Sequence, residues 1–244
     1  ATPGRLAQWV GVASSLERLR SDFGGGEEAT ASSVALFYGY DDRQTLWAPD
    51  GGTGLRAAVG YDHVFADPVA GSDQTPGALS FRVAGLKSWR LAAAHQLSLR
   101  GSISSFIAGQ PRPQLLFAVG GRRKVRGYVE DDALGRVRML GSAEWVHPLM
   151  WDLDWNGAWL GWVTGLDGAL FADLAAIVDG WGDLSRRARR ADVGYGLRLY
   201  LDYFGVQEGM MAFDVAVALM DDDGRFGLHG VQVYLDFVQS FFVF

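Results

Sequence analysis

Two carboxylates and one arginine are the residues of this sequence whose types and spacing suggest chemistry. Arg126 lies in a long polar segment, residues 109–135, and Glu144 and Asp173 follow it along the chain. Two carboxylates that share a site can act as general acid and general base, as in glycoside hydrolysis. A guanidinium offers five donors in a fork and can bind two acids at once. The three residues are therefore candidates for an acid–base pair or for a structural ion cluster.

Signatures of other chemistry are sparse. The chain has no cysteine, and its four histidines are far apart in the sequence: His63, His95, His147 and His229. Neither a Gly-x-Ser-x-Gly elbow, nor a phosphate-binding loop, nor His-Glu-x-x-His occurs. We therefore predict no enzymatic activity, no metal and no cofactor. A lipid hydrolase that uses Ser and His on a barrel wall is the enzyme class that stays open.

The composition excludes several classes of protein. The 244 residues include 22 basic and 28 acidic ones, a net charge of −6, which argues against nucleic acid as a partner. Aromatic residues make up 13 %, so the chain is not disordered. No apolar run reaches the roughly 18 residues that a membrane-spanning helix needs.

Apolar and polar residues alternate with a period of two, which is typical of β-strands. From Asp192 to Tyr203, for example, every second residue is apolar, and most of the residues between are polar or small. Strands of soluble proteins have about five or six residues, whereas a transmembrane strand needs about 9–11. The pattern predicts ten strands, many of them longer than ten residues, at 5–19, 29–43, 53–65, 77–91, 93–108, 136–149, 157–178, 191–204, 208–221 and 229–243.

Two folds would explain such strands, a soluble β-sandwich and a membrane barrel. Long strands, glycine on the polar face and aromatic residues near strand ends favour the barrel. We therefore expect an all-β fold, an antiparallel transmembrane β-barrel of about ten strands that forms one domain over residues 1–244. The alternation places Glu144, Phe171 and Asp173 on its inside. The tryptophans expected at the membrane interfaces are Trp9, Trp47, Trp89, Trp145, Trp151 and Trp155.

The segment of this sequence that is most characteristic of a particular protein family is Val119-Gly120-Gly121-Arg122-Arg123-Lys124-Val125-Arg126-Gly127-Tyr128. It resembles the Gly-Gly-x-x-x-Val-Arg-Gly-Tyr motif of the BamA/TamA superfamily of outer-membrane assembly and translocation barrels. The resemblance implies that the loop 109–135 turns back into the barrel lumen, where its arginine meets acids on the next two strands. We expect Gly127 to allow a tight backbone bend beside Arg126.

Two later segments resemble the strands that carry these acids. Gly141-Ser142-Ala143-Glu144-Trp145 is similar to the family's Glu-bearing strand, and Phe171-Ala172-Asp173-Leu174-Ala175 is similar to its Phe-x-Asp-x-Gly motif, with Ala175 in place of the glycine. The resemblance thus favours the ion cluster over the acid–base pair. We call the predicted set of Arg126, Gly127, Tyr128, Glu144, Phe171 and Asp173 the loop latch.

The end of the chain resembles the terminal β-signal of outer-membrane proteins, on Leu235, Phe237, Phe241 and Phe244. The chain departs from the family in two respects, because the usual barrel has sixteen strands and the periplasmic POTRA domains are not visible here. It is then a compact relative, a naturally short barrel or a piece of a longer protein. Ten strands suffice to close a barrel, and pairing of two copies into a homo-oligomer would build a wider one.

The resemblance implies an integral protein of the bacterial outer membrane that inserts or translocates polypeptides without a cofactor. Its expected partners are membrane lipid, polypeptide clients and a periplasmic protein. The alternative is a membrane anchor or passive pore for a secreted passenger, such as a lipid hydrolase, or for a partner outside this chain.

Overall fold

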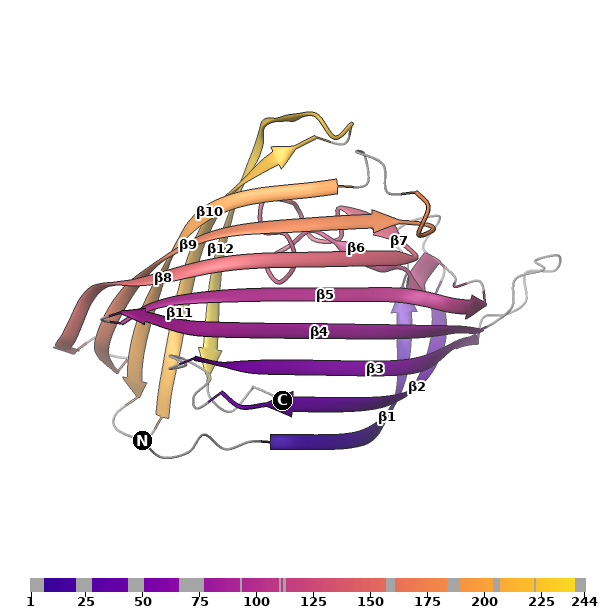
Figure 1. Ribbon diagram of the computed structural model, residues 1–244, viewed down its shortest axis with the longest axis horizontal. Coiled ribbons are helices and arrows are strands. Elements are labelled where there is room, and N and C mark those ends of the chain that lie inside the picture. The colour runs from indigo at the N-terminus through magenta and orange to yellow at the C-terminus, as the bar shows by residue number, and fades with distance from the viewer. Residues whose placement is uncertain are drawn as a thin grey trace.

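Ten long strands form a single antiparallel sheet, with order β1-β2-β3-β4-β5-β8-β9-β10-β11-β12, in the computed structural model (Figure 1). The structure describes residues 7–20, 28–43, 51–65, 77–92, 94–109, 111, 113–156, 161–183, 189–203, 207–221 and 223–239. The expected all-β antiparallel fold with ten long strands is thereby confirmed. The strands are β1 (Ala7–Arg20), β2 (Glu28–Asp41), β3 (Gly51–Phe65), β4 (Gly77–Ala92), β5 (His95–Gly109), β8 (Val137–Asn156), β9 (Trp162–Val178), β10 (Arg189–Tyr203), β11 (Gln207–Met220) and β12 (Phe226–Gln239).

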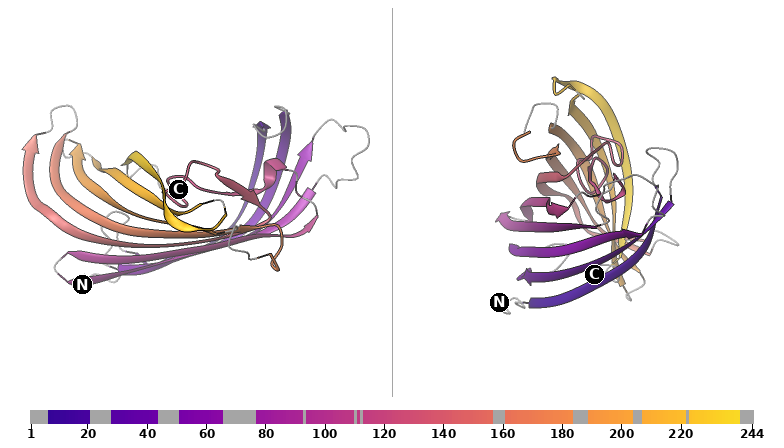
Figure 2. Two further views of the ribbon diagram at one scale, coloured as in Figure 1. Left: turned by 90° about the horizontal axis from the view of Figure 1, so that it is seen from above. Right: turned by 90° about the vertical axis from the view of Figure 1, so that its right-hand side faces the viewer.

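The alternation of the sequence gives the sheet two unlike faces. On β9, Leu174 is 62 % exposed and its neighbour Asp173 is 1 % exposed. The segment that joins β5 to β8 lies on the concave side of the curved sheet (Figure 2), and Asp173 binds Arg126 of this segment. Successive side chains of a strand point to opposite faces. We call the concave side with Asp173 the inner face and the convex side with Leu174 the outer face.

The expected closure into a barrel is not observed among the described residues. In that part of the chain β1 pairs with β2 and β12 pairs with β11, and no ladder joins β1 to β12. Adjacent strands of a sheet are rotated by roughly 20–25° on average. This twist accumulates over ten strands, so that β12 runs steeply across the direction of β3–β5 (Figure 1). The result is a strongly curved but open sheet.

Two predicted strand boundaries are wrong. β8 continues to Asn156 instead of ending at residue 149, and β9 begins at Trp162. Pro148 was expected near the end of its strand, yet it pairs with Asp167 inside the ladder. The register of β8 against β9 shifts directly after it, between Pro148 and Met150. Proline has no N–H for a regular ladder, and an irregular position of this kind is where a sheet accommodates it.

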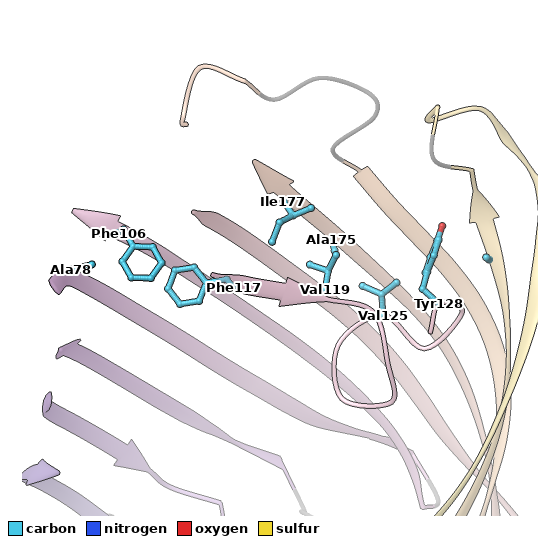
Figure 3. Packing of buried hydrophobic residues seen from close by; sticks show 9 residues of the cluster. Ala78, Phe106, Phe117, Val119, Val125, Tyr128, Ala175 and Ile177 are labelled. Carbon is cyan, nitrogen blue, oxygen red and sulfur yellow. The ribbon is translucent and has the colours of Figure 1, made fainter. Parts of the chain in front are cut away.

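The segment between β5 and β8 is more ordered than the sequence suggested. It contains a 3-10 turn, η1 (Pro113–Leu115), and a small hairpin of β6 (Phe117–Val119) and β7 (Ala133–Gly135). An apolar cluster fixes this hairpin to the inner face (Figure 3). The phenyl rings of Phe106 on β5 and Phe117 on β6 stack in it, with 4.8 Å between centroids. None of the helices in the described ranges is long and apolar enough to cross a membrane.

The tryptophans divide between the two faces. Trp89, Trp145, Trp151 and Trp155 are exposed, and their place at a membrane interface stays a prediction. The ring of Trp151 lies beside that of Tyr200 and is hydrogen bonded to Asp167 of the inner face. The expectation for Trp9 is wrong, because its ring lies on the inner face over Gly39 of β2. The missing side chain of the glycine makes room for the indole there. Trp47 is outside the described residues.

Candidate functional site

Arg126 at the tip of the 109–135 segment binds Asp173 of β9 through both ends of its guanidinium. Its Nε donates to Asp173 Oδ2 at 2.7 Å and its Nη2 donates to Asp173 Oδ1 at 3.1 Å. The exposed fractions of Arg126 and Asp173 are 5 % and 1 %. Paired N–H···O bonds of this geometry are the strongest kind that an arginine makes with a carboxylate.

The remaining nitrogen of Arg126 extends this pair into a closed network. Arg126 Nη1 donates to Glu144 of β8 at 3.1 Å and lies 3.4 Å from Asp214 of β11. Arg198 of β10 contacts the same two acids, with 2.5 Å to Asp214 and 3.5 Å to Glu144. Two arginines and two acids thus alternate around a ring, with Asp173 attached to Arg126. The ring joins the segment to four neighbouring strands.

The ring of Phe171 packs against the guanidinium group of Arg126. The guanidinium carbon of Arg126 lies 3.3 Å from the centroid of the Phe171 ring. Burial alone would lower the pKa of Arg126, but the hydrogen bonds to Asp173 and the charges of Asp173, Glu144 and Asp214 outweigh it, so the pKa is raised. Arg126 therefore stays charged at neutral pH despite its burial.

Gly127 allows the loop to approach the sheet closely. A Cβ atom on Gly127 would lie 2.7 Å from Asp192 Cβ and 2.8 Å from the Ala218 nitrogen. Its amide donates to Asp192 Oδ2 at 2.6 Å. Gly127 lies in a turn closed by the hydrogen bond from the Tyr128 amide to the Val125 carbonyl, at 3.4 Å, so the expected bend is present. Its φ is not positive, and the close packing is what requires a glycine there. Gly120 and Gly121, with φ of 91° and 95°, make an earlier turn of the loop.

Tyr128 inserts its hydroxyl where β10 and β11 separate. The oxygen lies 3.0 Å from the carbonyl of Ala191 and 2.9 Å from that of Met220. It also accepts hydrogen bonds from the amides of the same two residues, at 3.3 and 3.2 Å. The carbonyl of Tyr128 accepts a bond from the Tyr234 hydroxyl of β12 at 2.9 Å. One side chain thus satisfies backbone groups that the ladder leaves without a partner.

The structure brings all six residues of the predicted loop latch together, and that they act as a latch stays a prediction. The departure from the family motif, Ala175, is buried in the apolar cluster beneath the loop. Of the predicted β-signal, Leu235 is exposed on the outer face of β12 and Phe237 lies in the same strand. Phe241 and Phe244 are outside the described residues.

The sequence analysis did not predict three charged residues that lie in or beside the polar network of the loop latch, Asp192, Arg198 and Asp214. Each is a charged residue among small residues on the polar side of an alternating strand, and this is the signal that could have identified them. Asp192 is 1 % exposed, and Arg198 and Asp214 are 6 % and 7 % exposed. Arg198 and Asp214 form an ion pair with each other, whereas Asp192 accepts the Gly127 amide on Oδ2 and its buried Oδ1 has no hydrogen-bond partner among the described residues.

The arrangement is suited to holding a loop rather than to acid–base chemistry. Glu144 and Asp173 both accept hydrogen bonds from Arg126, so their oxygens are engaged in structural contacts. Within the described part of the chain, no group of three His, Asp or Glu side chains is placed to hold a metal ion. A scan against protein-family models and a search of curated proteins found no match to this chain.

Proposed function

We propose that this chain is the membrane-embedded sheet of an outer-membrane protein of the BamA/TamA type, which inserts or translocates polypeptides. One observation carries the proposal. The segment with the Val-Arg-Gly-Tyr sequence lies against the inner face, and Arg126 binds an acid on each of the next two strands, β8 and β9. This is the arrangement that the resemblance of the motif implies.

The outer face supports the membrane part of the proposal. It carries large apolar side chains on strands from both ends of the sheet, with exposed fractions of 71 % for Val12, 58 % for Leu36 and 66 % for Leu235. A soluble protein rarely exposes a continuous apolar surface of this extent. In a membrane barrel the same face is in contact with lipid, and the polar face lines the lumen.

The two sheet edges suggest how a client would be received. In the described part of the chain the outer edges of β1 and β12 have no strand beside them. The N–H and C=O groups of such an edge can pair with an added strand. A client strand would pair with the outer edge of β1 or of β12, while the loop latch holds the curvature of β8–β12.

The membrane topology is testable because the natural chain has no cysteine. Single cysteines at Leu174 on the outer face and at Ser102 on the inner face of β5 would carry an environment-sensitive fluorophore in proteoliposomes. We expect brominated lipid to quench the label at residue 174 and to leave the label at 102 unaffected. Equal quenching by iodide from the water phase at both positions would contradict a lipid-facing outer surface.

The activity is tested with proteoliposomes and an unfolded outer-membrane barrel protein as client, whose insertion is followed by protease protection. We expect the wild-type protein to accelerate insertion over protein-free liposomes, and Arg126→Lys to be slower because lysine lacks the two-ended contact. Arg225→Lys, in the turn before β12, is the matched control. Ion conductance without accelerated insertion would instead support the passive pore.

A further inference from the structure

A cavity of about 340 Å³ lies between the loop tip and the inner face of β1–β5, β8 and β9. Its wall includes side chains of β1, β3 and β5 and the segment 122–126 of the loop. A water molecule occupies about 30 Å³ in the liquid, so the cavity has room for about ten waters. It is therefore large enough for a small ligand and not merely for one ion.

The wall of this cavity is strongly cationic. Seven of its described residues are basic, against two acidic ones, Asp41 and Asp173. Four of the seven cations are bound elsewhere. Arg43 contacts Asp41 at 2.5 Å, Arg122 contacts Asp236 at 2.7 Å, Lys124 contacts Glu130 and Asp131, and Arg126 belongs to the loop latch.

Three arginines remain, and each comes from a different element. Arg56 projects from β3, Arg100 from β5 and Arg123 from the loop, and all three are exposed. Arg100 makes one long contact, 3.3 Å to Glu144, with about half of its side chain still exposed. For Arg56 and Arg123 the described residues provide no acid within ion-pair distance. Three guanidinium groups thus border one hollow, and among the described residues Arg100 is the one of the three that contacts an acid, through a single long bond to Glu144.

We propose that this cavity binds a small phosphate-bearing anion, held by Arg56, Arg100 and Arg123. A guanidinium fork matches the geometry of phosphate oxygens, and a phosphate presents oxygens in several directions. One arginine satisfies a planar carboxylate, whereas three arginines from three directions suit a tetrahedral group or a diphosphate. Of the acids beside the loop, Asp173 borders the cavity and is bound by Arg126, and Asp214 is bound by Arg126 and Arg198.

The binding site requires the folded sheet and the loop but no polypeptide client, so it is tested separately from the insertion activity. Isothermal titration calorimetry of the full chain in detergent micelles at low salt, with inorganic pyrophosphate as the probe, measures the affinity. We expect saturable binding, and about a tenfold loss of affinity for each of Arg56→Gln, Arg100→Gln and Arg123→Gln.

Arg82→Gln is the matched control, since Arg82 is exposed on the inner face of β4 but does not line the cavity. Circular dichroism verifies that each variant is folded, which we expect because the three arginines are exposed. Absence of pyrophosphate binding at millimolar concentration in the wild-type protein would overturn the proposal. So would an equal loss in Arg82→Gln, or unchanged affinity in the variant that lacks all three arginines.

The phosphate group has two sources, a soluble anion or a lipid headgroup, and nanodiscs separate them. The same titration is repeated in discs of phosphatidylcholine alone and in discs that also contain phosphatidylglycerol. Weaker pyrophosphate binding in the anionic discs identifies the lipid phosphate as a competitor for the three arginines. Equal binding in both discs identifies a soluble anion as the ligand.

Discussion

The two halves of the sheet have the same strand architecture but opposite charge on the inner face. On β8–β12 the acids Glu144, Asp173, Asp192 and Asp214 are buried or nearly so and contact the loop. On β1–β5 the inner face carries exposed arginines, among them Arg56, Arg82 and Arg100. The ion pairs of the loop tip, through Arg122 and Arg126, go to the acidic half.

This difference shows how one strand pattern provides two surfaces. Alternation alone makes one face polar, and the sign of its charge decides which half a cationic loop covers. The covered half becomes a packed interior, and the other half remains a wall beside a cavity. Four substitutions with matched controls test this comparison, in order of decreasing expected effect.

Removal of Arg126 should give the largest difference in stability between variants of the two halves of the sheet. Arg126→Ala leaves the buried carboxylate of Asp173 without its partner, which typically costs about 3–5 kcal/mol of the free energy of unfolding. Arg56→Ala removes an exposed arginine from the other half and should change that free energy by less than about 0.5 kcal/mol. Urea unfolding in lipid vesicles, followed by tryptophan fluorescence, measures both. Equal losses would mean that the loop is not bound preferentially to β8–β12.

A methyl group added where the loop touches the sheet should cost less. In Gly127→Ala the new Cβ would lie 2.7 Å from Asp192 Cβ, and we expect a loss of about 1–3 kcal/mol in the same unfolding assay. Gly141→Ala on β8 is the control, because no atom lies within 4 Å of its added Cβ. A control variant as unstable as Gly127→Ala would show that strand glycines matter for another reason than the loop contact.

The hydroxyl of Tyr128 provides a finer test. Tyr128→Phe keeps the ring but leaves backbone groups of Ala191 and Met220 without a partner, for an expected loss of about 1–2 kcal/mol. Hydrogen exchange should become faster at the amides of these two residues. Tyr38→Phe, with an exposed side chain on β2, should leave both the unfolding and the exchange unchanged. Unaltered exchange at both amides in Tyr128→Phe would argue against the bridging role.

The ion pair of Arg122 and Asp236 should contribute least. Both side chains are partly exposed, and pairs of this kind contribute about 0–1 kcal/mol. Asp236→Asn should therefore shift the unfolding midpoint only slightly, and added salt should reduce the shift. Asp214→Asn, in the buried ring of the same half, should have a larger effect. An effect of Asp236→Asn as large as that of Asp214→Asn would mean that burial does not set the ranking.

The residues of the loop latch could be found from the sequence because each belongs to a local pattern, either the alternation of a strand or a short motif. The alternation of β8 and β9 placed Glu144 and Asp173 on one face, and the resemblance connected them with Arg126. Asp214 was not connected with this set, because it joins the ring only through the register that puts Gly196 of β10 opposite it. Trp9 was expected at a membrane interface, and the space over Gly39 that holds its ring exists only once β1 and β2 are paired.

The sequence by itself determined the ten strands and which of their residues share a face, because side-chain direction in a strand depends on position alone. The tertiary structure decided which charges meet, that Gly127 is needed for close packing and that no ladder joins β1 to β12 among the residues that the structure describes. Those features depend on register, twist and the fold of the loop over the inner face. Each is set by contacts between residues that are far apart in the sequence, which a local pattern does not contain.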